Sequence, residues 1–425
     1  MISIYRILST TLYPFLIILI FLRRILKKED KFRFREKIFP STFFKVFKNN
    51  KRLVWFHAAS LGEVQSIIPI VNELNSSKQF NFLITTITTS SAAFIEEKFK
   101  NYDNIIHKYL PLDINFLIKK FILIWKPHAV FFVDSEIWPN LIYNLKDNNI
   151  PIAIINGRLT KKTYKRWRSI SKASFDLFSK FDLILSSSLE SKGYLEKLGG
   201  KNVFYLGNIK FLNRVDLKSI PKTNDSFLKD KIFWCAVSTH NNEEKFCIET
   251  HIKLKDNIKD ILTIIIPRHI NRSFKIENLC AKYKLNTQIL AKDEKISKNS
   301  EIVIINSFGG LSEYLVHAKS VLIGKSLLKK LENDGGQNPI LAAQLGCKIY
   351  YGPYVKNFQD VYNFLDEKNI SKKISSTIEL SINLLNDLKN NVKDFERSQK
   401  LIDSISSTIF EETKKKINKF VNYEN

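Results

Sequence analysis

Short runs of apolar residues alternate along the first half of the chain with segments in which apolar residues recur at helical spacing. The apolar runs predict strands at 52–57, 81–86, 129–133, 152–155, 183–186 and 203–206. Helical patterns fall between them, at 64–74, 90–100 and 115–124. This alternation is typical of a parallel sheet that is covered by helices on both faces.

A polar stretch at 216–230, which contains Pro221, separates this pattern from a second one. The second pattern predicts strands at 232–238, 261–267, 302–306, 321–324 and 348–351, followed by helix from Ile374 onward. Because 425 residues exceed one ordinary core, we predict two doubly wound α/β domains, 29–215 and 216–425. Such domains bind ligands in a cleft between their strand ends.

The first 28 residues form a segment of a different kind. No charge occurs from Ile7 to Leu22, and basic residues follow at 23, 24, 27 and 28. The length of the uncharged run is at the lower limit for crossing a bilayer, and Pro14 interrupts the run. No small-residue cleavage site follows it, as would be expected of a signal peptide that is removed. We predict an uncleaved membrane anchor over 1–28, either inserted or lying in the interface, with its basic flank facing the cytoplasm and anionic lipids. The alternative is a buried N-terminal helix.

Composition changes this picture only in part. The chain has 44% hydrophobic and 26% charged residues, typical of a globular protein, and a formal net charge of +25. Its lysines are spread along the whole chain and no nucleic-acid-reading motif occurs, so an anionic membrane or substrate is a better predicted partner than nucleic acid. The cysteines and histidines lack metal-ligand spacing, which predicts no metal site and a reducing compartment. His57 and His240, which border turns, are interpreted as structural histidines.

Two turns carry candidate chemistry. Residues 335–339 (Gly-Gly-Gln-Asn-Pro) lie between a predicted strand and a helix at 340–346, an order that directs free backbone N–H groups at a phosphate or another anion. An ordinary turn is the alternative. Far upstream, the strand 52–57 runs into a small-residue turn, and Glu63 lies in the first turn of the helix that follows. Glu63 is therefore either a carboxylate placed for chemistry at a strand end or one favoured only by the helix dipole.

Charged residues recur at four further strand ends. Asp134 and Glu136 follow one strand, Lys210 lies at the domain junction, and Arg268 ends a third strand. Residues 238–244 resemble the capped start of a helix. Each position taken singly is typical of a solvated loop, and their recurrence at strand ends favours a site.

Seven ordered motifs resemble the 3-deoxy-D-manno-octulosonic acid (Kdo) transferases, which attach Kdo from CMP-Kdo to the lipid A precursor of Gram-negative bacteria. The motifs lie at 60–63, 135–141, 156–159, 207–211, 238–240, 267–269 and 335–339, and the resemblance extends over nearly the whole chain. It implies the GT-B fold, with two Rossmann-like domains, an acceptor-binding domain before a CMP-sugar-binding one. It also implies a location on the cytoplasmic face of the inner membrane, inversion at the sugar, and no cofactor or metal.

The resemblance also implies roles for individual residues. Glu63 matches the general base that deprotonates the 6′-hydroxyl of the acceptor, and Asp134 and Lys210 match groups that stabilise the transition state. The CMP-contacting positions are Pro267, Arg268, Phe308, Gly309, Gly310, Asn338, Pro339, Ile340 and Leu341.

Three positions depart from the family pattern. Gly310 and Leu341 stand where the family has acids, and Asp134 is one methylene shorter than the usual glutamate. These departures leave two alternatives open, a GT-B transferase that uses another nucleotide sugar and a decayed, non-catalytic membrane-bound homologue.

Overall fold

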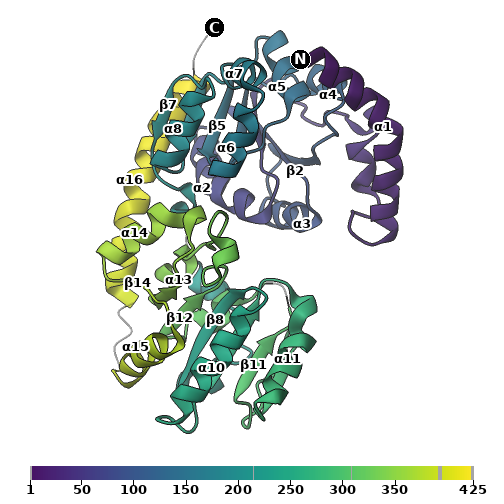
Figure 1. The fold of residues 1–425 in the computed structure, drawn as a ribbon. Helices are drawn as coiled ribbons and strands as arrows, with labels where there is room; N and C mark the ends of the chain where they lie inside the picture. The colour runs from purple at the N-terminus through teal and green to yellow at the C-terminus, as the bar shows by residue number, and fades with distance from the viewer. Residues whose placement is uncertain (1, 214, 308, 391–394, 423–425) are drawn as a thin grey trace. The chain divides into compact units, whose positions relative to one another are not determined.

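The structure is a computed structural model that describes residues 2–213, 215–307, 309–390 and 395–422 (Figure 1). Its chain forms two compact units. The first contains residues up to 213 together with those from 406 onward, and the second contains residues 214–405. Each unit is built around one parallel sheet, so the predicted two-domain α/β architecture is confirmed.

The sheet of the first unit has seven parallel strands in the order β3-β2-β1-β4-β5-β6-β7. The strands are β1 (Arg52–His57), β2 (Phe80–Thr86), β3 (Ile105–Tyr109), β4 (Ala129–Val133), β5 (Ile152–Gly157), β6 (Leu183–Ser186) and β7 (Val203–Tyr205). The helices that connect them are α2 (Leu61–Ser76), α3 (Thr89–Lys98), α4 (Asn115–Trp125), α5 (Pro139–Asp147), α6 (Lys161–Arg168), α7 (Ser171–Phe178) and α8 (Leu189–Lys197).

The sheet of the second unit also has seven parallel strands, in the order β10-β11-β9-β8-β12-β13-β14. The strands are β8 (Phe233–Thr239), β9 (Leu262–Pro267), β10 (Thr287–Leu290), β11 (Ile302–Ile305), β12 (Ser320–Ile323), β13 (Lys348–Tyr351) and β14 (Ser371–Lys373). The helices are α9 (Asp225–Asp230), α10 (Glu243–Lys255), α11 (Ser273–Lys282), α12 (Leu311–Leu315), α13 (Ile340–Gln344), α14 (Gln359–Glu367) and α15 (Thr377–Lys389).

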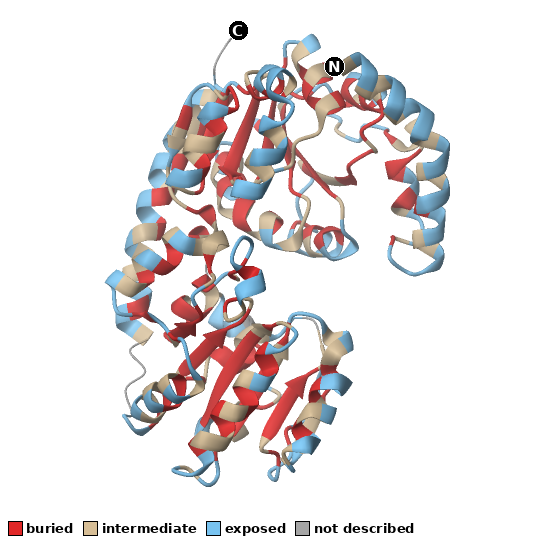
Figure 2. Ribbon diagram, viewed as in Figure 1, coloured by how far each residue is buried: buried red, intermediate tan, exposed pale blue. Residues whose placement is uncertain are grey.

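Strands β4 and β5 of the first sheet and β11 and β12 of the second are buried along their whole length (Figure 2). Strands covered on both faces need apolar side chains on both, which is why they appear in the sequence as continuous apolar runs rather than as alternating ones. The core of the first unit is rich in aromatic residues, and Trp55, Phe121 and Trp125 pack there with less than 1% of their surface exposed. These large side chains fill the space between the sheet and α4.

Helix α16 (Phe395–Val421) corrects one predicted domain boundary. The predicted second domain ran to residue 425, whereas residues from 406 onward belong to the first unit. Three contacts explain this assignment. The Phe420 ring lies 5.3 Å from that of Phe131, and His128 Nε2 lies 2.8 Å from the Val421 carbonyl oxygen. Lys414 also forms an ion pair with Glu73, with 2.6 Å between the charged atoms. The first unit is therefore discontinuous in sequence.

Helix α1 (Ile2–Ile25) continues through Pro14, so the predicted interruption of the apolar run is wrong. The helix has the length and apolar composition to cross a membrane. One side of it contacts the first unit: the Tyr5 hydroxyl donates to Asp113 Oδ2 at 2.9 Å, and the Tyr13 hydroxyl donates to the Ile38 carbonyl. The side chains of Ile7 and Phe15 are 65% and 67% exposed. The predicted anchor thus has one face docked on a folded unit and an apolar face toward the surroundings.

The contact between Tyr5 and Asp113 predicts a measurable role for α1 in stability. Burial raises the pKa of Asp113 to about 6, and hydrogen bonds, including the one from Tyr5, oppose that rise. Tyr5→Phe removes a donor to a buried carboxylate, so we expect the free energy of unfolding at pH 8 to fall by about 1–3 kcal/mol. Denaturant unfolding in detergent measures it. Tyr102→Phe, which alters an exposed tyrosine, is the matched control and should change stability by less than about 0.5 kcal/mol. Equal stability of the Tyr5 variant and wild type would show that α1 is not held by this bond.

Candidate active site

The order of strands in the first sheet fixes where its chemistry can lie. Strands β1 and β4 are neighbours, and the chain leaves them in opposite directions along the sheet. Open α/β sheets bind ligands at such a switch point, beyond the carboxyl ends of the strands. Glu63 lies in the first turn of α2, directly after β1, and Asp134 directly follows β4. The two predicted carboxylates therefore flank the switch point.

Glu63 has the properties of a base that works near neutral pH. Its Oε2 accepts a hydrogen bond from the Ala59 N–H at 2.7 Å, and its Oε1 accepts one from Ser60 Oγ at 2.8 Å. Burial raises the pKa of Glu63 to about 7, and the negative charges of Asp134 and Glu136 add to the rise. A carboxylate with a pKa near the working pH is well matched to general-base catalysis.

Asp134 and Lys210 form an ion pair whose geometry is set by Asn156. Lys210 Nζ lies 3.0 Å from Asp134 Oδ2, and both side chains are mostly buried. Asn156 Nδ2 donates to Asp134 Oδ1, while Asn156 Oδ1 accepts from the Ile209 N–H at 3.0 Å. Asn156 thereby joins the loop after β4 to the short 3₁₀ turn Ile209–Leu212 that carries Lys210.

Asn156 is a site residue that sequence reasoning missed, although it belongs to one of the recognised motifs. Both Asp134 and Asn156 have a left-handed backbone, with φ of 58°. Asn and Asp tolerate this conformation better than other residues, apart from glycine. Asn156 lies near the end of a strand and directly before Gly157. This pattern could have predicted a left-handed turn that directs the Asn156 side chain away from the strand.

A second group of contacts surrounds Glu136. The fully buried His57 ring places Nδ1 at 3.0 Å from Thr85 Oγ1 and Nε2 at 3.4 Å from Glu136 Oε2. Trp138 Nε1 donates to the same carboxylate oxygen at 3.0 Å. His57 is thus held between polar partners, in agreement with the structural role predicted for it.

The switch point of the second sheet lies between the neighbouring strands β8 and β12. The loops after them pass so close together that a Cβ on Gly324 would lie 2.6 Å from the Ser238 carbonyl oxygen. The fully buried Glu243 carboxylate holds both loops by accepting backbone hydrogen bonds of 2.7–2.9 Å. Its donors are the N–H groups of His240, Lys325, Ser326 and Leu327.

Cationic side chains gather at this second switch point. Burial lowers the pKa of His240 to about 4, and the neighbouring basic side chains, Lys325 first among them, add to the lowering. His240 Nε2 is buried and has no hydrogen-bond partner among the described residues, so the interpretation of His240 as a satisfied structural histidine is wrong for this atom. Arg268 is exposed at the end of β9. Arg272 pairs with both oxygens of the Glu244 carboxylate, and Lys325 Nζ lies 3.8 Å from Asp334 Oδ2, so the exposed Arg268 is the cation of this group best placed to meet a bound anion.

The turn at 335–339 differs from its prediction. The Gly335 N–H donates to the Leu331 carbonyl and the Gly336 N–H to the Lys325 carbonyl, both at 2.6 Å, so neither is free for an anion. A Cβ on Gly335 would lie 2.1 Å from the Tyr354 carbonyl oxygen, so this glycine is needed for close packing. Helix α13, which follows, has only five residues. Asn338 and Pro339 stay predicted contacts, while the glycines have a structural explanation.

Comparison with known proteins shows which proteins the chain is similar to. The family described as 3-deoxy-D-manno-octulosonic-acid transferase (kdotransferase) matches residues 32–213. The 3-deoxy-D-manno-octulosonic acid transferase of Rickettsia bellii is 29% identical over 422 residues, covering 95% of this chain and 97% of the relative. That of Aquifex aeolicus is 27% identical over 373 residues, covering 87% and 96%. The family model thus covers most of the first unit, and the similarity to curated Kdo transferases extends over nearly the whole chain.

Comparison with solved structures confirms the predicted GT-B fold. A glycosyltransferase from Rickettsia africae superposes with a TM-score of 0.57 at 10% identity, covering 89% of this chain and 100% of that one. The UDP-GlcNAc 2-epimerase of Neisseria meningitidis superposes with a TM-score of 0.57 at 15% identity, covering 88% and 99%. At these identities the likeness shows the fold alone.

The remaining residues predicted for the site belong to the second unit. Pro267 ends β9, and Gly309 and Gly310, both with positive φ, precede α12. Phe308 lies outside the described residues. Ile340 is buried at the start of α13, whereas Leu341 is only partly buried. Leu341 has therefore not been absorbed into the core, and the position at which the family has an acid stays accessible.

Proposed function

We propose that the protein is an inverting glycosyltransferase that moves Kdo from CMP-Kdo to the 6′-hydroxyl of the lipid A precursor. The observation that carries the proposal is Glu63, whose raised pKa and place at the first switch point suit a base acting on a hydroxyl. Similarity supplies the substrate class, since relatives that match over nearly their full length carry the name of Kdo transferase.

The proposed reaction is a single displacement. Glu63 takes the hydroxyl proton as the acceptor oxygen bonds to the anomeric carbon of Kdo. The bond from that carbon to the phosphate oxygen breaks, and its electron pair leaves with CMP. Because the oxygen enters on the face opposite to the leaving group, the configuration inverts.

Two charge changes accompany this displacement. Positive charge grows on the sugar, as in the oxocarbenium-like states of glycoside hydrolysis, and negative charge grows on the departing phosphate. In the first unit, the pair of Asp134 and Lys210 supplies fixed charges of both signs at the switch point. In the second unit, the exposed Arg268 suits the phosphate of CMP. Pro267, Gly309, Gly310, Asn338, Pro339, Ile340 and Leu341 are the proposed further contacts to CMP.

We also propose that the protein works on the cytoplasmic face of the inner membrane, with α1 lying in the interface. The support is the docking of one face of α1 on the first unit together with the exposed apolar side chains on its other face. A helix that packs one face against a domain and exposes an apolar face is better suited to lie in the membrane interface than to span the membrane. Arg24 and Lys27, at and just after its end, would meet anionic headgroups.

One assay tests the reaction. The protein in detergent is incubated with CMP-Kdo and a tetraacylated lipid A precursor, and the products are read by mass. We expect the acceptor to gain the mass of one or more Kdo units, and UDP-sugars to give no product. Transfer from a UDP-sugar alone would establish a different GT-B transferase, and CMP-Kdo left intact would favour the non-catalytic homologue.

Arg268→Ala tests the nucleotide half of the proposal separately. Losing a charge-assisted bond to phosphate should weaken CMP binding by about tenfold to a hundredfold in calorimetry and lower turnover as well. Lys282→Ala removes an exposed charge at the far end of α11 and should leave CMP affinity within about twofold. Unchanged CMP affinity in the Arg268 variant would remove that residue from the site.

A further inference from the structure

Helix α6 and the residues just after it form a strongly basic stretch on the surface of the first unit. Six of the twelve residues at 161–172 are Lys or Arg and none is acidic, whereas Lys and Arg make up 67 of the 425 residues of the chain. All six are exposed (Figure 2). We call them the α6 basic cluster: Lys161, Lys162, Lys165, Arg166, Arg168 and Lys172.

The basic residues within α6 share one side of the helix, because they recur at spacings of three and four. Tyr164 and Trp167 lie on the other side and pack against the hydrophobic core of the first unit. The Tyr164 ring stacks on that of Tyr194 at 4.5 Å, and the Trp167 ring meets that of Phe178 edge-on at 5.4 Å. This packing fixes which side of α6 faces outward, and that side is the basic one.

The cluster lacks a charged partner within the part of the chain that the structure describes. None of its six side chains forms an ion pair or a hydrogen bond with a carboxylate there. Acids on the next two helices are engaged by other groups. Asp176 of α7 pairs with Lys180 at 3.2 Å, and Glu190 of α8 accepts from the Tyr194 hydroxyl at 2.7 Å. An anionic surface placed against the cluster would offset the repulsion among its cations.

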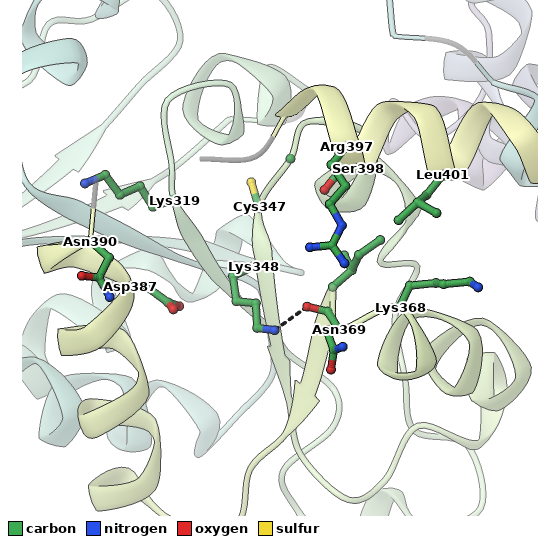
Figure 3. A pocket seen from close by; sticks show the side chains of 12 residues that line it. Lys319, Cys347, Lys348, Lys368, Asn369, Asp387, Asn390, Arg397, Ser398 and Leu401 are labelled. Atoms are coloured by element: carbon green, nitrogen blue, oxygen red, sulfur yellow. Dashed lines mark hydrogen bonds between the residues drawn. The ribbon is translucent and has the colours of Figure 1, made fainter. Parts of the chain in front are cut away.

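Basic residues that gather in the second unit are placed differently. A cavity of about 180 Å³ is lined by Lys319, Lys348 and Arg397, among others (Figure 3). Lys319 Nζ donates to the Leu388 carbonyl oxygen at 3.1 Å, and Lys348 Nζ donates to that of Asn369 at 2.5 Å. These two lysines connect elements of their own unit, whereas the cations of α6 face the surroundings.

Helix α6 lies on the same face of the first sheet as α1. The chain passes from β1 through β2 to β3 in one direction along the sheet and from β4 to β7 in the other. Because crossovers between parallel strands are right-handed, α2 and α3 cover one face and α4 to α8 cover the other. Tyr13 and Leu16 of α1 pack against the same hydrophobic core as Tyr164 and Trp167 of α6. A bilayer on that side of the unit is therefore within reach of both helices.

We propose that the α6 basic cluster is a second contact with the membrane and binds the anionic headgroups of the bilayer on which α1 lies. A headgroup layer is a continuous anionic surface, which suits cations spread along one side of a helix. Ile170 and Phe175, which follow α6 closely, are exposed apolar residues of the kind found in segments that bind such surfaces. The proposal rests on the interfacial position proposed for α1.

Binding of the full chain to lipid vesicles tests the two contacts separately. Vesicles of phosphatidylcholine measure the contribution of α1, and vesicles with equal amounts of phosphatidylcholine and phosphatidylglycerol add that of the cluster. The variant Lys161→Gln, Lys165→Gln, Arg166→Gln, Arg168→Gln should bind the mixed vesicles about a hundredfold or more weakly than wild type, since each cation near anionic lipid contributes about fivefold. It should bind phosphatidylcholine vesicles as wild type does.

The matched control removes four exposed lysines on the other side of the first unit, by Lys98→Gln, Lys100→Gln, Lys415→Gln and Lys419→Gln. Its affinity for mixed vesicles should stay within about threefold of wild type, because charges away from the bilayer are screened. Circular dichroism and transfer in neutral detergent should be unchanged in both variants. Wild-type affinity of the α6 variant for mixed vesicles, an equal loss in the control, or an equal loss on phosphatidylcholine overturns the proposal. Failure of wild type to bind phosphatidylcholine would contradict the position of α1, and the proposal with it.

A second measurement uses wild-type protein alone and needs no variant to fold. Mixed vesicles should slow acetylation of the four lysines of the cluster, followed by mass spectrometry, more than that of Lys98 and Lys100. Equal protection of both groups overturns the proposal. So does protection of the cluster by an RNA oligonucleotide but not by mixed vesicles.

The acceptor is the other anionic occupant to be distinguished from the bilayer. If the cluster bound the acceptor instead, the α6 variant would have a raised KM for it in neutral detergent and would bind mixed vesicles as wild type does. That result overturns the proposal and leaves the proposed transfer reaction standing.

Discussion

Glu63→Gln should lower the rate of transfer by about a hundredfold to ten-thousandfold while leaving CMP affinity nearly unchanged. The glutamine cannot take up the hydroxyl proton. It keeps the size of the side chain and an oxygen that can accept a hydrogen bond from the Ala59 N–H or the Ser60 hydroxyl. Single-turnover kinetics with saturating CMP-Kdo isolates the chemical step. A variant that kept more than about a tenth of the wild-type rate would show that another group is the base.

The pH dependence of the same pair of proteins gives an independent check. The pKa of Glu63 is raised to about 7, so wild-type turnover should rise as the pH increases through 7 and the carboxylate forms. A carboxyl with a raised pKa in the folded state favours folding while protonated and costs stability once ionised. Wild type should therefore lose stability between about pH 4.5 and 7, and the glutamine variant should be the more stable of the two at pH 8. This order of stabilities would also exclude misfolding as the cause of the lost activity.

Lys210→Met should lower turnover by about a hundredfold to a thousandfold, because it removes a fixed positive charge from the switch point of the first sheet. It also leaves Asp134 without its cation, so the variant should melt at a lower temperature than wild type. Single-turnover rates and thermal unfolding, measured on the same preparation, separate the two effects.

The double variant Lys210→Met, Asp134→Asn is the matched control for this pair. Neutralising both partners should recover much of the lost stability but none of the lost turnover. Recovery of turnover together with stability would mean that the pair only holds the loops in place and takes no part in transfer.

The apolar runs predicted the central strands well because burial on both faces leaves few residue types available. Strands β1, β4, β6 and β13 begin and end where the pattern placed them. The three strands that were not predicted, β3, β10 and β14, all lie at sheet edges. Edge strands face solvent and can hold polar residues, as the Ser-Lys-Lys sequence of β14 illustrates, so periodicity carries little signal for them.

The site could be predicted less completely than the fold. Motif and position were enough to select Glu63, Asp134 and Lys210, and the structure brings the last two into contact. The link through Asn156 depends on two left-handed residues whose side chains meet only in the folded chain. The sequence also could not reveal that the N–H groups of Gly335 and Gly336 donate hydrogen bonds to neighbouring carbonyl groups, because these partners too meet only in the folded chain.

The division of α16 between the two units has a consequence for synthesis on the ribosome. His128 and Phe131 emerge early, but the helix end that contacts them follows only at residues 420 and 421. At about 5–20 residues per second, the roughly 200 residues between the two parts of the first unit take roughly 10–40 seconds to be made. During that interval the part of the first unit already made lacks the end of α16, so the apolar surface around Phe131 that this helix covers is left exposed. We expect chaperone dependence to be concentrated in that interval and to be relieved by a copy of the helix supplied in trans.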